Sequence, residues 1–580
     1  MELSQAAKAI LEKRYLKKKY GQVIETPEDM FRRVANNIAM AEENYCKHHV
    51  AEMTEAFFQI MTRLEFLPNS PTLMNAGRDL QQLSACFVIP VEDSIEGIFD
   101  ALKVAALIHK SGGGTGFSFS RLRPKNDTVQ TTGGVASGPL SFMKIFNVAT
   151  EEIKQGGARR GANMAILRVD HPDILDFIKA KKDATKYTNF NFSVAITDEF
   201  MQAVAVNTTY GLRNPHTNKI VTELLATDVY NAIIDMAWHN GEPGVVFIDR
   251  INGANPTPHV GYIESTNPCG EQPLLPYESC NLGSINLAKF VNDNKEIDWE
   301  RLKYVTGTAV QFLDNVIDMN QYPLESIAEV TKGNRKIGLG VMGFTDMLIQ
   351  LGVGYAEDRA VEIAEQVMGF IHTEARNASK ELATWRGAFP NYKGSIYEQQ
   401  GLPLRNATLT TIAPTGTISM IADCSSGIEP LYALAYKRKI IDEESDMQIN
   451  QHVKKLLEEH GINNKNLLER ISERGSVQGI NEIPLELQKL LVTAHDITPK
   501  QHVRMQAAFQ KYTDNAVSKT VNFPSNASKG DIAKVFNLAY ETGCKGITVY
   551  RDGSRLGQIL QVSSVTNGGY MQTCPKCASD

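Results

Sequence analysis

The chain has 580 residues, of which 42% are hydrophobic and 22% are charged, and its formal net charge is -6 at pH 7. This length allows a large buried core, and the slightly acidic balance argues against a broad nucleic-acid-binding surface. The sequence has no apolar run of the roughly 20 residues that a membrane span requires, and it does not begin like a signal peptide. We expect a cytoplasmic protein that binds neither nucleic acid nor membranes and holds anionic ligands through local donors.

The N-terminal region, residues 1–75, is predicted to be a small helical region. Thr26 has the character of a helix N-cap, Pro27 follows it in the first turn, and apolar residues then recur at helical spacing. From about residue 76 the pattern changes to short apolar strands followed by helices, as in residues 190–196 and the helix start after them. We assign residues 76–560 to one α/β unit, either an open sheet or a closed barrel.

The segment Asn267-Pro268-Cys269-Gly270-Glu271 places a carboxamide, a thiol and a carboxylate at alternate positions. In an extended segment such residues point to one side, where they would face a ligand together. A thiol beside a hydrogen-bond donor and a possible general base suits chemistry on a polyol. The residues alone leave an equal alternative, a loop with a buried structural cysteine.

Two glycine-containing segments have features of phosphate sites. Residues 409–413 are a plausible strand, and residues 414–419 turn from it into a helical run, which would aim backbone N–H groups at one point. An ordinary capped helix start is the alternative. Residues 338–343 satisfy the dinucleotide fingerprint, but a helix and no second strand with a terminal acid follows, so we interpret them as a tightly packed strand.

The eight cysteines are too few for a disulfide scaffold. Cys574 and Cys577 form a CxxC pair within residues 561–580, a tail without periodicity that we expect to be mobile. A redox dithiol is favoured over half of a zinc site completed by another chain, because no second pair of ligands lies nearby. Cys46, Cys424 and Cys544 are interpreted as packing residues.

The central motif, residues 267–271, and six further segments resemble the signatures of class II, adenosylcobalamin-dependent ribonucleotide reductases, and they occur along the chain in the order expected for that family. The central motif is followed by Ser279-Cys280-Asn281-Leu282-Gly283. The others are Pro68-Asn69-Ser70-Pro71-Thr72, Ser84-Ala85-Cys86, residues 111–116, residues 155–161, Pro414-Thr415-Gly416-Thr417-Ile418 and residues 548–555. The resemblance covers most of the chain, and it implies a ten-stranded α/β barrel with a central finger loop.

By this resemblance, Cys269 becomes a thiyl radical that takes the 3′ hydrogen of a ribonucleotide, Glu271 deprotonates the 3′ hydroxyl and Asn267 orients the substrate. Cys86 and Cys280 would supply two electrons and the proton for loss of the 2′ hydroxyl as water. Cys574 and Cys577 would then reduce the resulting disulfide and be reset by a thioredoxin-like reductant. The implied substrate-binding residues are Ser70, Ala85, Cys86, Gly114, residues 267–271 (Asn267, Pro268, Cys269, Gly270, Glu271), Pro414, Thr415, Gly416, Thr417 and Ile418.

The resemblance also implies regulation and a cofactor. Asp93 matches the acid that binds an effector, a deoxynucleotide or ATP, and Arg121 and Arg123 could hold its phosphates or form a solvated surface pair. Residues 132–138 and 155–161 are similar to the specificity loops that connect this effector to the substrate in a homodimer. Adenosylcobalamin is expected to bind with its own base on cobalt, since the sequence has no Asp-x-His-x-x-Gly motif. No protein metal site is expected.

Three alternatives remain at this level. A class I catalytic subunit would need a metal-containing partner and a tyrosine pair for radical transfer, whereas Tyr550 is followed by Arg551. A glycyl-radical enzyme is the second alternative, but only residues 568–570 weakly resemble the glycyl-radical motif, and the central motif does not favour this class. A catalytically inactive nucleotide-sensing homologue would have no need of five thiols. Diphosphates are favoured over triphosphates as substrates.

Overall fold

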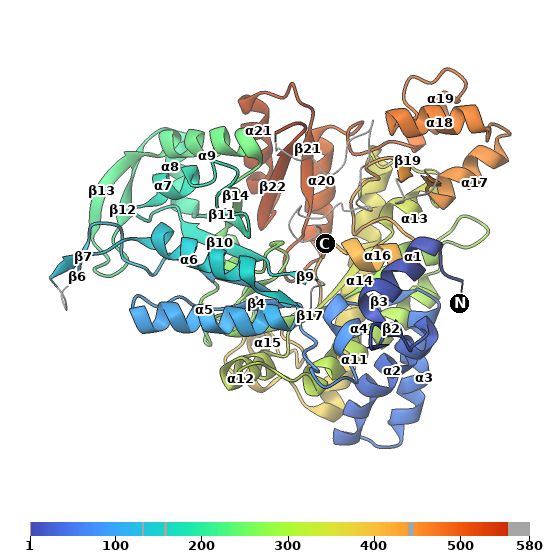
Figure 1. Cartoon of the computed structure of the whole chain (residues 1–580), viewed down its shortest axis with the longest axis horizontal. Coiled ribbons are helices and arrows are strands. Elements are labelled where there is room, and N and C mark those ends of the chain that lie inside the picture. Colours follow the sequence, from blue (N-terminus) through green and yellow to red (C-terminus); the bar gives the residue numbers. More distant parts are fainter. Residues whose placement is uncertain (1, 130–132, 156–158, 439–445, 555–580) are drawn as a thin grey trace.

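A computed structural model of the chain describes residues 2–129, 133–155, 159–438 and 446–554 (Figure 1). The N-terminal region is helical, as predicted, with α1 (Gln5–Ile10), α2 (Pro27–Ala39) and α3 (His49–Thr62). Thr26 caps α2: its hydroxyl accepts a hydrogen bond from the Asp29 N–H at 3.1 Å, and the Asp29 carboxylate accepts one from the Thr26 N–H. Such a cap stabilises a helix by about 1 kcal/mol. The apolar face of α2 then packs against α3 and α11 (Trp299–Met319).

The first half of the α/β unit is a run of five parallel strands. In spatial order they are β4 (Cys86–Val88), β5 (Gly114–Ser118), β10 (Asn163–Arg168), β11 (Phe190–Ile196) and β14 (Gly244–Phe247). Helices α5 (Ile95–Lys110), α6 (Pro139–Glu152), α7 (Ile174–Lys179) and α9 (Ala226–Asn240) pack on the outer face and share one apolar core with these strands. The predicted strand at residues 190–196 is β11, and α8 (Asp198–Val206) follows it with Thr197 as N-cap.

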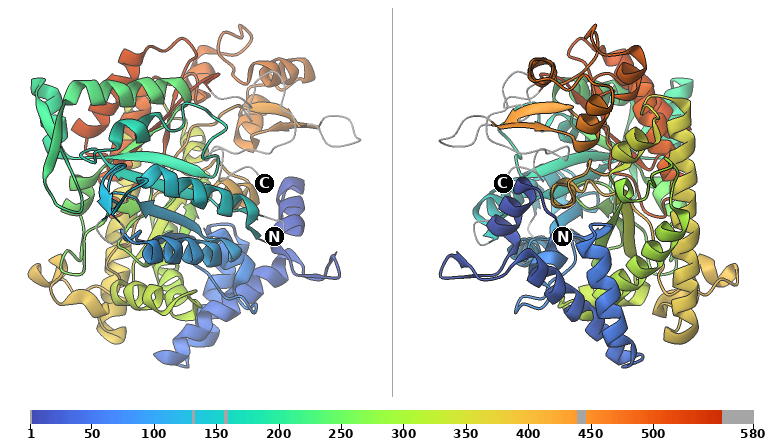
Figure 2. Two further views of the ribbon diagram at one scale, coloured as in Figure 1. Left: turned by 60° about the vertical axis from the view of Figure 1, so that its left-hand side comes forward. Right: turned by 90° about the vertical axis from the view of Figure 1, so that its right-hand side faces the viewer.

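The strands of the second half of this unit run antiparallel to those of the first half. It contains β17 (Glu278–Asn286), β18 (Ile337–Met342), β21 (Thr520–Phe523) and β22 (Gly546–Arg551), with β17 antiparallel to β4 and β22 antiparallel to β14. Outside them lie α11, α14 (Asp358–Arg386) and α20 (Pro499–Gln510). Figure 2 shows these long helices on the side of the molecule away from α5 and α6.

The segment 408–412 closes the ring between β18 and the residues before β21. The Leu339 N–H donates to the Leu409 carbonyl at 2.7 Å, and the Ser518 N–H donates to the Ile412 carbonyl at 2.8 Å. With this segment the second half also has five members, so the sheet closes into the predicted ten-stranded α/β barrel. Closure leaves the barrel without an open edge on this path.

A hairpin enters the barrel from the chain before β17. Its arms are β15 (Ser265–Thr266) and β16 (Pro273–Leu274), and its tip is the loop 267–272. A Cβ at Gly116 of β5 would lie 1.7 Å from the Thr266 carbonyl oxygen, so only glycine allows the hairpin to pass so close. At the tip, the Glu271 carbonyl accepts hydrogen bonds from the Ala516 N–H and the Thr411 hydroxyl on the opposite half. The hairpin is the predicted central finger loop.

The glycine-rich stretch 338–343 is a packed strand, as interpreted from the sequence. Residues 338–342 of this stretch belong to β18 (Ile337–Met342), and every residue of the strand is buried. A Cβ at Gly340 would meet the Thr411 carbonyl oxygen at 2.2 Å. The glycines here allow neighbouring backbone to approach.

Among the helices that the structure describes, none is both long and apolar enough to cross a membrane.

Candidate active site

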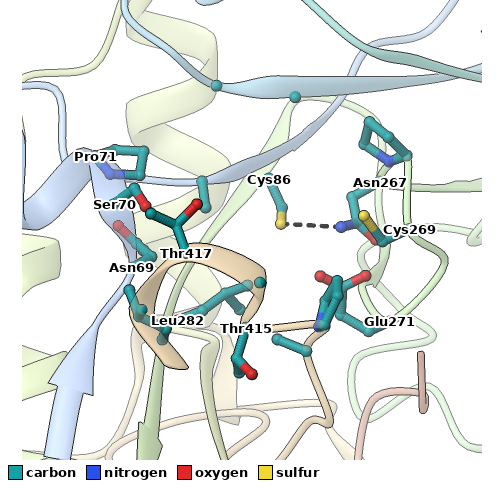
Figure 3. A pocket seen from close by; sticks show the side chains of 18 of the residues that line it. Asn69, Ser70, Pro71, Cys86, Asn267, Cys269, Glu271, Leu282, Thr415 and Thr417 are labelled. Carbon is teal, nitrogen blue, oxygen red and sulfur yellow. Dashed lines mark hydrogen bonds between the residues drawn. The ribbon is translucent and has the colours of Figure 1, made fainter. Parts of the chain in front are cut away.

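A cavity opens beside the finger tip, and its wall comes from both halves of the barrel (Figure 3). Its empty space is about 990 Å³, counting the solvent at its open mouth. The finger tip, β4, β5 and β17 form one part of the wall, and the first turns of α4 (Ser70–Asn75) and α16 (Gly416–Ala422) form another. Every predicted substrate-binding residue except Gly270 lines this cavity.

The finger tip presents its three functional side chains through a turn. The prediction of an extended segment is wrong, because residues 268–271 form turns and bends, with the Gly270 N–H donating to the Asn267 carbonyl at 3.1 Å. Gly270 has φ +83°, a conformation that favours glycine. Asn267, Cys269 and Glu271 nevertheless all line the cavity, because the hairpin holds its tip inside the barrel.

Cys86 and Cys280 face each other across β4 and β17. They are register partners in the antiparallel pairing, a position whose Cα separation suits a disulfide. The Asn267 amide donates to the Cys86 sulfur at 3.2 Å, shown as the dashed line in Figure 3. Cys86 is 3% exposed and lines the cavity, whereas Cys280 is 0% exposed. Burial raises the pKa of the Cys280 thiol well above its usual value, and Glu278 adds to that effect.

Two helix starts border the opposite side of the cavity. Thr415, at φ +56°, precedes α16, and its hydroxyl accepts a hydrogen bond from the Gly427 N–H at 2.7 Å. Asn69 caps α4 by accepting the Thr72 N–H at 2.9 Å. Ser70 and Thr417 lie near each other in Figure 3, one from each helix. Backbone N–H groups and hydroxyls from two directions make this side suited to an anion.

Other cavity residues had no assigned role in the sequence analysis. Asn69 stands in the motif with Ser70, and its position before Ser-Pro-Thr is a recognisable helix-cap signal. Tyr15 lies behind the wall: its hydroxyl is 2.7 Å from the Ser70 hydroxyl, and the ring is buried. No local sequence signal marks Tyr15, because the contact spans 55 residues. The remaining residues of this kind are Pro71, Gly112, Gly113, Ala162, Leu282, Gly283, Ser284 and Ala413.

The proposed effector residues lie outside the cavity. Arg123 donates to the Asp93 carboxylate through its side chain at 2.8 Å and its backbone N–H at 3.1 Å. Arg121 pairs with Glu264 at 2.9 Å and also with Glu92. Each of the two arginines is therefore bound to a carboxylate. Parts of the two glycine-rich loops, residues 132 and 156–158, lie outside the described residues, as do Cys574 and Cys577.

The three remaining cysteines lie away from the cavity. Burial raises the pKa of the Cys544 thiol to about 11 and that of Cys424 well above its usual value, as expected for packing residues. Cys46 is half-buried. Within the described ranges, no group of three or more His, Cys, Asp or Glu side chains is arranged to hold a metal ion.

Comparisons with known proteins agree with the fold and with the cavity. Residues 84–403 and 398–550 match the family "Ribonucleotide reductase, barrel domain", and residues 1–81 match "Ribonucleotide reductase, all-alpha domain". The structure superposes on the class Id ribonucleotide reductase alpha subunit of Actinobacillus ureae with a TM-score of 0.78, at 22% identity and over 95% of this chain and 97% of that one. The chain belongs to the ribonucleotide reductase family.

More similar relatives define its place within that family. The chain is 49% identical to the vitamin B12-dependent ribonucleoside-diphosphate reductase of Thermoplasma acidophilum, over 97% of its own length and 80% of the relative's. It is 46% identical to the enzyme of the same name from Mycobacterium tuberculosis, with the same coverage. It therefore falls in class II, the vitamin B12-dependent ribonucleotide reductases, which confirms the resemblance.

Proposed function

We propose that the chain reduces ribonucleoside diphosphates to deoxyribonucleoside diphosphates at this cavity. The observation that carries the proposal is the juxtaposition of Cys269 on the finger tip with the Cys86–Cys280 pair in the barrel wall. A ribose between them would present its 3′ carbon to one sulfur and its 2′ hydroxyl to the other two. The finger and the wall thus separate the radical thiol from the reducing thiols.

The side chains divide the reaction as follows. The Cys269 sulfur, as a thiyl radical, takes the 3′ hydrogen, and Glu271 accepts the proton of the 3′ hydroxyl. Between them, the Cys86 and Cys280 thiols give one proton to the departing 2′ hydroxyl, which leaves as water, and one proton with two electrons to the 2′ carbon, and their sulfurs become a disulfide. The hydrogen on Cys269 then returns to the 3′ carbon. Overall, one ribonucleotide and two thiols give one deoxyribonucleotide, one disulfide and one water.

Asn267 has a positioning role in this scheme. Its side-chain oxygen Oδ1 accepts a hydrogen bond from the Gln272 N–H at 3.0 Å, and its side-chain N–H₂ group donates to the Cys86 sulfur. Both polar atoms of the side chain are therefore held in place. A fixed amide can orient ribose hydroxyls without reorganising during the reaction. The first turns of α4 and α16 would hold the diphosphate, with the Ser70 and Thr417 hydroxyls as further donors.

Adenosylcobalamin would supply the radical when bound, by homolysis of its cobalt–carbon bond. The finger tip is open beside Cys269, because a Cβ at Gly270 would meet no atom within 4 Å. Cys269, which is half-buried, and Gly270 would therefore face the cofactor. The chain's part is to hold this sulfur between the open side and the ribose, and to exclude water from the ribose.

The partners proposed for the chain follow from its surface. Ile95 and Phe99 on α5 and Val148 on α6 are large apolar side chains that are 59%, 46% and 59% exposed. Leu107 and Ile145 on the same helices are also exposed, and α5 packs against α6, so these side chains would supply apolar contacts in a homodimer. Asp93, Arg121 and Arg123 would bind a deoxynucleotide or ATP effector near the start of α5. An effector phosphate would have to displace the carboxylates that now hold the arginines.

The remaining step is recycling of the active-site disulfide. Cys574 and Cys577 would reduce it by thiol–disulfide exchange, and a thioredoxin-like protein would reset the tail. Replacing either cysteine by Ser should spare a single turnover with preloaded thiols and block recycling by a protein reductant. Equal loss of both activities would indicate a structural metal site in the tail.

The decisive test is reconstitution. The purified chain with adenosylcobalamin, a dithiol, an effector and a ribonucleoside diphosphate should form deoxynucleotide without a metal-loaded partner. If activity appeared only after addition of an iron- or manganese-containing subunit, the class I alternative would replace this proposal. Nucleotide binding without turnover under both conditions would favour the sensing homologue.

A further inference from the structure

Three charged or thiol side chains meet at the start of β17, and none of them is among the residues that line the substrate cavity. Glu278 stands two residues before Cys280 on β17, so the two side chains point to the same face of the strand. Lys336 immediately precedes β18, and the pairing of Asn281 with Ile337 places it beside Cys280. The Cys280 sulfur lies 3.3 Å from the Asn281 carbonyl oxygen and 3.6 Å from the Lys336 carbonyl oxygen, the two acceptors within reach of its S–H.

Glu278 and Lys336 form a buried ion pair. The Lys336 ammonium donates to the Glu278 carboxylate at 2.8 Å, and the two side chains are 1% and 0% exposed. The same carboxylate accepts from the Leu275 N–H at 2.8 Å and from the Asn334 amide at 2.6 Å. Replacing such a pair by apolar side chains is often neutral for stability. Its position next to a reacting sulfur therefore suggests a role beyond stability.

Access to the cavity gives the two sulfurs different roles during reduction. Cys86 lines the cavity, whereas Cys280 is fully buried in the wall behind it. An incoming thiolate therefore attacks Cys86, forming a mixed disulfide and breaking the Cys86–Cys280 bond. The electron pair leaves on the Cys280 sulfur as a thiolate. A second thiol of the reductant then releases Cys86, so the reductant becomes a disulfide and the protein gains two electrons.

We propose that Lys336 and Glu278 are positioning residues that set how readily Cys280 leaves as a thiolate, with Lys336 favouring its release and Glu278 opposing it. This inference rests on the proposed function, in which Cys86 and Cys280 form a disulfide in each turnover. The physical basis is that the departing negative charge forms at a fully buried sulfur, where a neighbouring ammonium or carboxylate acts strongly. A better-stabilised leaving thiolate makes exchange faster. The directions agree with the pKa of the Cys280 thiol, which burial raises, Glu278 raises further and Lys336 lowers.

The test follows reduction of the oxidised chain by dithiothreitol. Alkylation and mass spectrometry report the free thiols of the Cys86 and Cys280 peptides over time. We expect Lys336→Met to slow reduction on the order of tenfold, because the leaving thiolate loses its ammonium. Lys336→Arg should restore most of the rate, and Glu278→Gln should reduce at least as fast as the unmodified chain.

A matched control is Lys181→Met, because Lys181 and Glu242 form another buried ion pair, with side chains 8% and 7% exposed. This variant should be reduced at the unmodified rate. Where Lys336→Met does not accumulate as folded protein, Lys336→Gln keeps a donor to Glu278 and should also be slow. An unchanged rate in the neutral Lys336 variants, or equal slowing by Glu278→Gln, would overturn the inference. Failure of the Cys86–Cys280 disulfide to form at all would instead refute the proposed function.

Discussion

The active-site cavity and a charged junction between the N-terminal region and the barrel helices are both buried and polar, but they use burial differently. The junction joins Glu42 in the N-terminal region to Asp314 on α11 and to Arg386 at the end of α14. The Arg386 guanidinium, 0% exposed, donates to Glu42 at 2.6 Å and to Asp314 at 2.8 Å. Each of these charges has an opposite charge in contact, so the junction fixes how the two regions dock.

In the cavity, the reactive side chains line the wall and backbone contacts hold the loop that carries three of them. The Glu271 carbonyl is bonded to Ala516 and Thr411, while its carboxylate lines the cavity. The comparison teaches that the buried charges of the junction hold two regions of the fold together, whereas the polar groups that line the cavity are placed to act on a ligand. Substitutions should therefore separate activity from stability.

The largest effect on activity is expected for Cys269→Ala. The sulfur carries the radical and does not hold the phosphates, so deoxynucleotide formation should fall below detection while nucleotide binding stays nearly intact. Product assays and binding of a ribonucleoside diphosphate measure the two. Cys46→Ala, at another half-buried cysteine, is the control and should remain active. Appreciable turnover by Cys269→Ala would refute the central assignment.

Glu271→Gln should reduce kcat by about 10²- to 10⁴-fold, which is the usual contribution of a general base. The backbone contacts that hold residue 271 remain in this variant, so the unfolding midpoint should hardly change. Steady-state kinetics and thermal unfolding of the same preparation provide the comparison. A loss of stability together with activity would place Glu271 among the structural groups.

Arg386→Met should give the converse result. It leaves Glu42 and Asp314 buried without this guanidinium, and breaking a buried pair costs about 3–5 kcal/mol. Denaturant unfolding should show this loss, while kcat per folded molecule stays close to that of the unmodified chain. Arg359→Met, in an exposed ion pair with Glu362, is the control and should cost under about 1 kcal/mol.

The junction should also make stability depend on acid. Burial raises the pKa of Asp314, but Arg335, Arg405 and Arg386 outweigh it and lower the value from 3.8 to about 2. Because the folded pKa lies below the unfolded one, the contribution is complete above about pH 4 and is lost as the pH falls toward 2. It should amount to about 2 kcal/mol. Between pH 5 and pH 2 the free energy of unfolding should fall for both proteins. The fall should be about 2 kcal/mol smaller for Asp314→Asn than for the unmodified chain.

The smallest effect is expected for Tyr15→Phe, which removes only the hydroxyl next to Ser70. A net hydrogen bond is worth about 1 kcal/mol, so KM for the diphosphate substrate should rise about fivefold or less, with kcat unchanged. Tyr20→Phe, on a residue 97% exposed, is the matched control and should leave KM unaltered. A fall in kcat without a change in KM would contradict a role in substrate binding.

Helices and strands that depend on residues close together in the sequence were predicted from local sequence patterns. Thr26 and Pro27 mark the start of α2 because a cap and its first turn lie within four residues, and residues 190–196 have the composition of the buried strand β11. The motifs around Ser70, Cys86, Cys269 and Thr415 were recognised, and all four residues line one cavity. The finger tip was predicted to be extended because residue spacing alone does not reveal the Gly270 turn.

The sequence by itself determined the helical N-terminal region, the α/β alternation, the family and the residues with reactive side chains, because each rests on composition, short-range spacing or motifs. Only the tertiary structure decided that the sheet closes through residues 408–412, that Cys86 and Cys280 are register partners, and that Tyr15 lies behind Ser70. It also decided that Lys336 lies beside Cys280. These contacts join residues tens to hundreds of positions apart, and they depend on strand order and packing that no local pattern encodes.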